Sequence, residues 1–244
     1  MKRRSIGTGW WVGIVLTLSF ASYLPMLLDQ SGAAVPQSLL YLRYGFILIP
    51  ALVSLLFSVY EGVGREYLLS GFRHISRREI VVWTILALVG ILSVCVYSVP
   101  AEINLFRAAY PSLAAFAGSC LYLFATAIVE ELAWRRFLFR RILARGGRLR
   151  AALLTGAVWA VWHIPMWTVR NLLGAEEIAP LFLWAVLLSV VLGIFYSIFE
   201  NILSAALLHM TFNVCYLMPA LYNDILLLVG ILLCTALWAY RKRR

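Results

Sequence analysis

The chain has 244 residues, of which 63% are hydrophobic and 13% charged, and its formal net charge is +10. Soluble domains average about 45–50% apolar and about 25% charged residues, so this composition excludes an ordinary soluble protein. Because the hydrophobic excess extends along the whole chain, one anchor helix does not explain it, and the sequence predicts an all-α, multi-pass membrane protein.

Eight apolar stretches are long enough to cross a bilayer, which takes about 20 residues in a helix. The sixth and seventh are separated only by Glu200 and Asn201, which predicts a tight turn between them. We therefore expect a transmembrane bundle of about eight spans. In chain order they lie near residues 10–28, 39–60, 80–99, 111–133, 151–169, 181–199, 201–218 and 225–240.

The connections between these spans alternate in their content of arginine. Segment 61–79 holds four arginines and segment 134–150 holds seven, whereas 29–38 and 219–224 hold none. Cytoplasmic connections carry an excess of Lys and Arg, which predicts that both termini are cytoplasmic. Membrane topology thus accounts for the positive charge. Nucleic acid is not an expected partner, because no soluble basic domain is present to bind it.

Segment 134–150, WRRFLFRRILARGGRLR, mixes aromatic and aliphatic side chains with arginine. It is expected to continue the fourth helix into the headgroup region and to break at Gly146 and Gly147. A basic amphipathic surface of this kind favours anionic lipid headgroups. A surface that recognises substrate is the alternative.

Two adjacent glutamates, Glu130 and Glu131, stand at the end of the fourth predicted span. Ionisable residues within spans are costly and mark function or paired structure. Glu131 and Arg135 are spaced i, i+4, so we expect them to pair on one helix face. Glu130 points about 100° away, toward a partner on another helix. The alternative is an interfacial helix end with two solvated carboxylates.

The fifth and seventh spans carry further polar groups. His163 follows Trp159 by one helical turn, and Pro165 weakens the helix just beyond it. His209 and Asn213 are spaced i, i+4 and project from one helix face, which favours a shared polar site. The alternatives are a core histidine with satisfied hydrogen bonds, and polar contacts that only hold helices together.

Together these side chains form a set suited to hydrolysis. Counted from the predicted span ends, Glu130, His163 and His209 are expected in the cytoplasmic half of the membrane. The same three residues make a His2Glu set that suits Zn²⁺, with an open position for a nucleophilic water. Without metal, a glutamate can act as general base on water, while His and Asn side chains donate to the oxyanion. Both mechanisms stay open.

Other known site patterns are missing from the sequence. There is no H-E-x-x-H, which excludes a zincin, and no G-x-S-x-G or suitably placed Ser/His pair, which leaves a rhomboid-type serine mechanism unsupported. The only aspartates are Asp29 and Asp224, both near predicted external ends, which argues against a presenilin-type site.

Three motifs on three of the spans resemble those of the CPBP intramembrane proteases, which include the type II CAAX prenyl endopeptidases and bacterial Abi and bacteriocin-immunity proteins. The family pattern is E-E-x-x-x-R, then F-x-x-x-H, then H-x-x-x-N or H-x-x-x-D. A tryptophan stands here where the family usually has phenylalanine. The matching residues are Glu130, Glu131 and Arg135, then Trp159 and His163, then His209 and Asn213.

The resemblance implies an endopeptidase that cleaves a peptide bond near the cytoplasmic face. It implies that Glu130 and His163 activate the attacking water and that His209 and Asn213 stabilise the oxyanion. Glu131 would support the site, and Arg135 would pair with a carboxylate, with Trp159 as further structural support. The expected partners are the lipid bilayer and a peptide or protein substrate, with a prenylated or hydrophobic tail among the candidates.

The resemblance also divides the chain into consecutive regions. Residues 1–110 form about three N-terminal spans, 111–218 the catalytic core, and 219–244 the last span and a basic tail. The expected location is a bacterial cytoplasmic membrane. A catalytically silent immunity or scaffold protein of the same fold is the alternative. A small-solute transporter is disfavoured, because no paired broken helices or inverted halves are evident.

Overall fold

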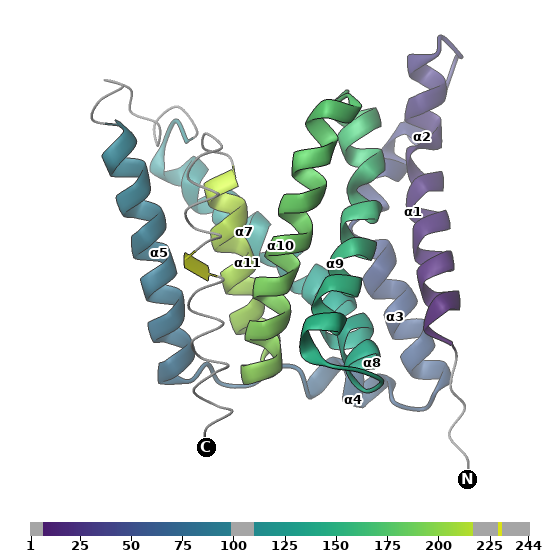
Figure 1. The fold of residues 1–244 in the computed structure, drawn as a ribbon. Helices are drawn as coiled ribbons and strands as arrows, with labels where there is room; N and C mark the ends of the chain where they lie inside the picture. The colour runs from purple at the N-terminus through teal and green to yellow at the C-terminus, as the bar shows by residue number, and fades with distance from the viewer. Residues whose placement is uncertain (1–6, 99–109, 217–228, 231–244) are drawn as a thin grey trace. The chain divides into compact units, whose positions relative to one another are not determined.

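The computed structural model describes residues 7–98, 110–216 and 229–230, and every regular element among them is helical (Figure 1). The predicted all-α class is therefore confirmed. The chain divides into two compact units: unit 1 is Met1–Gly71 with Leu132–Val190, and unit 2 is Phe72–Glu131 with Val191–Arg244. These units are interleaved along the chain, whereas the predicted regions 1–110, 111–218 and 219–244 are consecutive. The functional division into those regions stays a prediction.

Unit 1 is built around an aromatic core. The ring centroids of Trp11 and Trp134 lie 5.5 Å apart, those of Trp134 and Trp162 lie 5.4 Å apart, and Trp162 stacks on Phe46 at 4.0 Å. Such pairs add directional stabilisation to the burial of large side chains. The elements of this unit are α1 (Thr8–Gln30), α2 (Gln37–Leu40), η1 (Tyr41–Gly45), α3 (Leu48–Tyr60), α4 (Gly64–Leu69), η2 (Leu132–Phe139), α8 (Arg140–Leu143), α9 (Arg148–Pro165), η3 (Met166–Arg170) and the first part of α10 (Ala175–Phe199).

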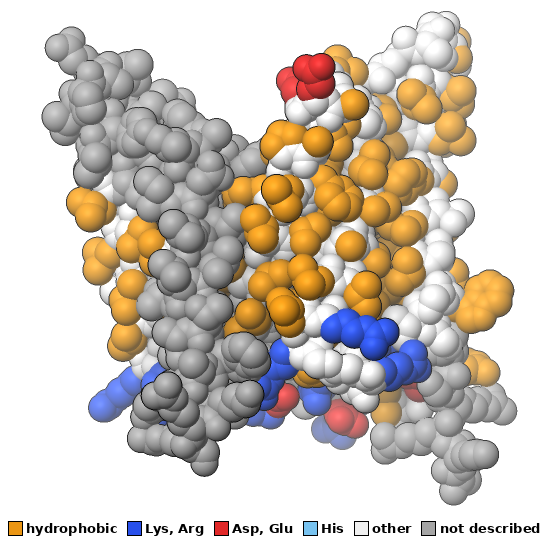
Figure 2. Space-filling view, in the orientation of Figure 1, with side chains coloured by type: hydrophobic (Ala, Val, Ile, Leu, Met, Phe, Trp, Pro, Cys, Tyr) orange, Lys and Arg blue, Asp and Glu red, His pale blue; other side chains and the backbone are white. Residues whose placement is uncertain are grey.

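Two hydrogen bonds connect the ends of α1 to other parts of unit 1. At one end the Arg145 guanidinium donates to the Thr8 hydroxyl over 3.4 Å, and at the other Gln30 donates to the Val169 carbonyl over 2.7 Å. On the face of unit 1 seen in Figure 2, hydrophobic side chains follow the helices, and Lys and Arg side chains gather at one end. α1 therefore starts at the arginine-rich end, as the predicted topology requires.

Close packing within unit 1 fixes α9 against α10. A Cβ atom added to Gly156 would lie 2.9 Å from the Ser189 Cβ and 3.1 Å from the Val186 Cα. Only glycine fits this contact without displacing a neighbour, and small residues at helix crossings are the usual solution in membrane proteins.

Unit 2 contains α5 (Arg77–Ser98), α7 (Leu113–Glu131), the remainder of α10 and α11 (Ile202–Tyr216). Its helices are joined by polar contacts at several levels. The buried Glu79 carboxylate accepts from the Ser204 hydroxyl at 2.6 Å, and the Trp83 indole donates to the Thr211 hydroxyl at 2.8 Å. These bonds connect α5 to α11 and hold both helices in register.

Among the described residues, four helical stretches are long and apolar enough to cross a membrane: Thr8–Gln30, Leu113–Leu143, Arg148–Arg170 and Ala175–Phe199. A fifth is formed if Gln37–Gly45 and Leu48–Tyr60, bent by 61°, count as one broken span. The structure agrees with the other predicted spans to different extents. Span 80–99 coincides with α5, span 201–218 includes the shorter apolar helix Ile202–Val214, and span 225–240 lies outside the described residues except for 229–230. Eight spans and cytoplasmic termini stay predictions.

Both predicted turns are confirmed, one at Gly146 and Gly147 and the other at Glu200 and Asn201. α8 ends at Leu143, and α9 begins at Arg148 directly after Gly147. Glu200 has a φ of 51°, and the Asn201 side chain accepts a hydrogen bond from the Leu203 amide at 3.1 Å. Asn201 thus caps α11 in the usual manner of an N-cap asparagine.

The surface interpretation of segment 134–150 is wrong for its first part. Ala133 through Phe139 are buried, including the charged side chains of Arg135 and Arg136, whereas Arg140, Arg145 and Arg150 are exposed. The reason is that η2 packs against α3, α4 and α9 of unit 1.

Candidate active-site residues

The two glutamates lie inside a continuous helix and not at its end. α7 passes directly into η2 and α8, so the helix runs from Leu113 to Leu143. Glu130 is 7% exposed and Glu131 is fully buried. These observations exclude an interfacial helix end with two solvated carboxylates. A buried carboxylate is stable only with compensating partners, so the positions of both glutamates need an explanation.

In unit 2, Glu131 is bonded to His209. The Oε1 atom of Glu131 lies 2.9 Å from the Nδ1 atom of His209, and both side chains are buried. α7 and α11, which carry these residues, form the most extensive described helix pair of the unit. Asn213 lies one turn beyond His209 and is half-buried. His209 is thus one partner of Glu131, and the Glu131–Arg135 pair expected from the i, i+4 spacing stays a prediction.

In unit 1, His163 is held by its own helix. Its Nδ1 atom lies 2.8 Å from the backbone carbonyl oxygen of Trp159. A carbonyl oxygen only accepts, so Nδ1 carries the hydrogen and Nε2 of the neutral ring keeps its lone pair. The ring lies edge-on to Trp159 and Trp162, with centroids 4.9 and 4.7 Å away, and stacks on Trp167 at 5.3 Å. These contacts fix the plane of the half-buried imidazole.

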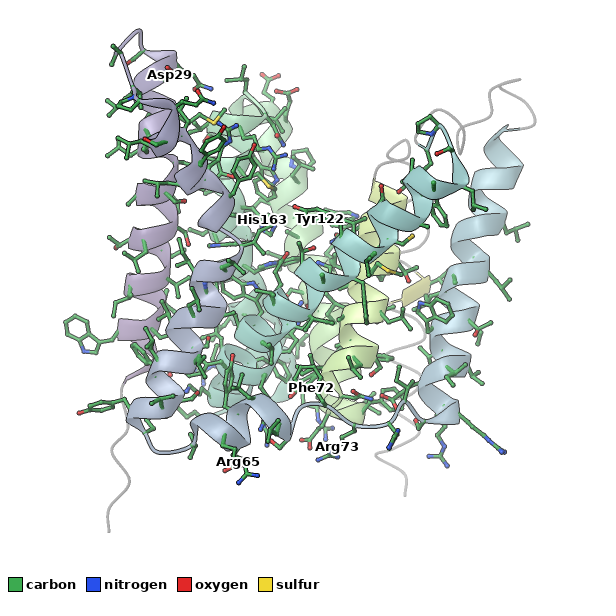
Figure 3. The ribbon with its side chains drawn as sticks, turned by 180° about the vertical axis from the view of Figure 1, so that it is seen from behind. Asp29, Arg65, Phe72, Arg73, Tyr122 and His163 are labelled. Carbon is green, nitrogen blue, oxygen red and sulfur yellow. The ribbon has the colours of Figure 1, made fainter. Side chains whose placement is uncertain are left out.

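His163 lies farther along its helix than the sequence predicted. At 1.5 Å per residue it is about 22 Å from Arg148 and about 10 Å from Arg170. The helix begins before the predicted span and continues through η3, which places His163 past its midpoint counted from the arginine-rich end. Figure 3 shows Asp29 and Arg65 at opposite ends of unit 1, with His163 between them. The helix changes from α to π directly after Pro165, as a missing backbone donor favours.

Arg135 and Trp159 belong to one contact in unit 1. The guanidinium carbon of the fully buried Arg135 lies 5.5 Å from the centre of the Trp159 ring. A cation over an indole face is attracted by the ring quadrupole. Trp159 therefore contacts two of the predicted site residues, Arg135 through its ring and His163 through its backbone carbonyl.

Tyr67 is a support that the sequence analysis missed. Its hydroxyl donates to the Leu132 carbonyl at 3.0 Å, at the first residue of the π-helical segment η2. Arg136 in turn donates to the backbone carbonyl oxygens of Tyr67 and Glu66. Nothing in the local pattern around Tyr67 signals this role, whereas Trp162 and Trp167 could have been found from their helical spacing to His163.

The donor set suits a metal in part. Zinc-binding histidines commonly donate one ring N–H to a carboxylate or carbonyl oxygen and bind through the other nitrogen. His163 and His209 both engage an oxygen through Nδ1. Within either unit, the described residues include no group of three His, Cys, Asp or Glu side chains that could hold an ion. The expected Zn²⁺ set of Glu130, His163 and His209 draws on both units and stays a proposal.

Membrane-length apolar helices that carry buried carboxylates and oriented histidines define a polytopic membrane protein with acid–base groups inside its helices. Residues 112–215 match the family model described as Type II CAAX prenyl endopeptidase Rce1-like, so this region of the chain is similar to that family of proteases. The matched region runs from just before α7 into α11 and contains all seven predicted site residues. This match supports the predicted CPBP membership. No curated protein matches the chain.

Proposed function

We propose that the chain is an intramembrane endopeptidase that hydrolyses a peptide bond of a membrane-associated peptide or protein. The observation that carries this proposal is the buried Glu131–His209 pair inside the family-matched region. Desolvating a carboxylate and an imidazole within apolar helices costs stability, and hydrophobic residues would pack there at no such cost. A scaffold or immunity protein has no need of the pair, which is why we favour catalysis.

In the proposed reaction, Glu130 accepts a proton from water and His163 orients that water through Nε2. The resulting hydroxide attacks the peptide carbonyl carbon, and the carbonyl oxygen becomes an oxyanion. Asn213 and His209 donate hydrogen bonds to this oxyanion. Glu130 then returns the proton to the leaving amine as the C–N bond breaks, which yields a carboxylic acid and an amine.

The role of His209 depends on the proton it shares with Glu131. Donation from Nε2 requires a hydrogen there, so either the ring is an imidazolium beside the Glu131 carboxylate, or a protonated Glu131 donates to Nδ1 of a neutral ring. In both cases one proton lies in the Glu131–His209 bond. We therefore assign Glu131 as a positioning residue that sets the donor state of His209.

A zinc-dependent route uses the same region of the chain in another way. Zn²⁺, when bound, would lower the pKa of a water and polarise the peptide carbonyl. Glu130, His163 and His209 would hold the ion, with each histidine binding through Nε2. His209 cannot bind metal and donate a hydrogen bond through the same nitrogen. The two routes therefore assign His209 incompatible roles.

The proposed substrate is a peptide or protein with a lipidated or otherwise hydrophobic tail. The family description names prenyl endopeptidases, which makes a prenylated C-terminal tail the first substrate to test. Peptide precursors and C-terminal sorting tails come next. A bacterial cytoplasmic membrane is the proposed location.

The decisive experiment measures cleavage of prenylated and unprenylated fluorogenic peptides by the chain in lipid nanodiscs. We expect Glu130→Gln and His163→Asn each to lose about 10²–10⁴-fold in kcat, the usual contribution of a general acid–base group. Glu177→Gln, at an exposed position, is the control and should retain wild-type activity. Wild-type rates in both site variants would refute the assignment.

Repeating the cleavage assay with a chelator distinguishes the metal route from the glutamate route. Loss of cleavage with a chelator and recovery with Zn²⁺ would support the metal route, and unchanged cleavage would support the glutamate route. A wild-type chain that binds these peptides but cleaves none would favour the scaffold alternative.

A further inference from the structure

Two cavities adjoin at the arginine-rich end of unit 1. The smaller, of about 350 Å³, lies between the Ser58–Tyr67 stretch and the Arg136–Ala144 stretch. The larger, of about 520 Å³, is lined by residues of the α3–α4 turn and of α4. Val63 and Glu66 line both cavities, so they form one hollow, which we call the α4 hollow. Figure 3 shows Arg65, a lining residue, at this end.

The lining of the α4 hollow is positively charged. Arg136, Arg140 and Arg141 line the smaller cavity, and Arg65 lines the larger one. Guanidinium groups still outnumber carboxylates after Glu66, which lines both cavities, and Glu61, the partner of Arg141, are counted. An anion is therefore the favoured occupant.

Of the three arginines that line the smaller cavity, two are fixed in place and one is available. The buried Arg136 donates to the Glu66 carbonyl oxygen at 3.2 Å and to the Ser70 hydroxyl, and Arg141 pairs with the Glu61 carboxylate. Arg140 is exposed and has no hydrogen bond or ion pair to the residues that the structure describes. Its guanidinium group offers donors in a fork that matches a phosphate.

The surroundings of the α4 hollow favour a lipid over a soluble anion. Leu56 and Val59 on the last turns of α3 are 67% and 60% exposed, and Leu69 on α4 is 60% exposed. Leu69 itself lines the larger cavity. An acyl chain can pack on these side chains while its headgroup enters the charged hollow, an arrangement that a free phosphate cannot use.

We propose that the α4 hollow binds the phosphate of an anionic phospholipid, with Arg140 as the direct ligand and Arg136 and Arg141 supplying a fixed positive field. The acyl chains lie on the exposed apolar faces of α3 and α4. Lipid binding at this site does not depend on proteolysis, so it can be tested independently of the proposed function.

The test titrates phosphatidylglycerol and phosphatidylcholine of equal chain length onto the purified chain and follows bound lipid by native mass spectrometry. The wild-type chain should bind phosphatidylglycerol more tightly than phosphatidylcholine. Arg140→Gln should weaken phosphatidylglycerol binding about tenfold, the effect of one charge-assisted hydrogen bond. Arg140→Lys should lose less. The matched control is Arg150→Gln, an exposed arginine near the start of α9 that lines neither cavity.

Equal losses in Arg140→Gln and Arg150→Gln would overturn the proposal in favour of diffuse attraction to anionic headgroups. Competition by inorganic phosphate at the concentration of the lipid would overturn it in favour of a soluble anion. Competition by an acidic peptide, with no preference for phosphatidylglycerol, would assign the hollow to a peptide instead.

Discussion

His163 and His209 are both held through Nδ1, but by partners of different kinds. His163 bonds to a carbonyl oxygen of its own helix, four residues earlier, and lies among tryptophan rings. His209 bonds to a carboxylate on another helix, 78 residues away. A neutral acceptor fixes orientation alone, whereas a carboxylate also stabilises the positive charge of an imidazolium. The comparison teaches that one histidine is oriented by the backbone of its own helix and the other by a charged side chain on a neighbouring helix.

The largest expected effect on kcat comes from removing the carboxylate that holds His209. We expect Glu131→Ala to lower kcat by about 10–100-fold, the usual cost of removing an outer partner of a site histidine. Glu131→Gln keeps an acceptor for the ring N–H and should lose less, with an altered pH profile of kcat. Glu79→Ala is the control, because it removes another buried carboxylate of unit 2 that bonds to Ser204. Equal losses in the Glu131 and Glu79 variants would contradict a specific role.

A smaller effect tests how α9 is held in unit 1. We expect Gly156→Ala to lower the free energy of unfolding by about 1–3 kcal/mol, since its Cβ would overlap Ser189 and Val186. Gly118→Ala is the matched control, because an added Cβ meets nothing within 4 Å there. The measurement is the thermal midpoint in detergent. Equal midpoints for both variants would show that α9 and α10 can separate without cost.

The smallest effect concerns the tryptophan that stands where the family usually has phenylalanine. Trp159→Phe keeps the backbone carbonyl that orients His163 and weakens only the ring contact with Arg135. We expect a twofold to fivefold lower kcat, in keeping with about 0.5–1 kcal/mol for the cation–π contact. Trp10→Phe, at a 73% exposed position, should change nothing. A loss as large as that of Glu131→Ala would mean that the aromatic environment, and not the carbonyl, holds His163.

Most of the helical pattern could be predicted because it depends on local chemistry. Gly146 and Gly147 end one helix, and Asn201 caps another, as their residue types suggest. The 61° bend within the predicted span 39–60 was not foreseen, because hydropathy measures how apolar a stretch is and carries no information on its direction. The burial of Arg135 and Arg136 was also missed, since arginine in a basic run is usually exposed.

For the site residues too, the sequence shows which residues are unusual but not how their helices pack against one another. The polar residues of the site could be identified from the sequence, because ionisable groups are rare in apolar helices. The bond between Glu131 and His209 could not be derived, because it depends on how α7 packs against α11. Tyr67 could not be identified for a similar reason: its bond to the Leu132 carbonyl depends on how α4 packs against η2.

The π-helical segment η2 affects how relatives of this chain should be aligned. A π-helical segment contains more residues per turn than an α-helix. If one of these extra residues is removed, the side chains that follow it in the helix turn by about 100° around the helix axis. A relative that keeps the glutamates and the following arginines facing the same directions with a regular α-helix would be shorter here by one residue. Alignments should therefore permit a single gap after Arg135 and before Phe139, inside an unbroken helix, where gaps are normally penalised most.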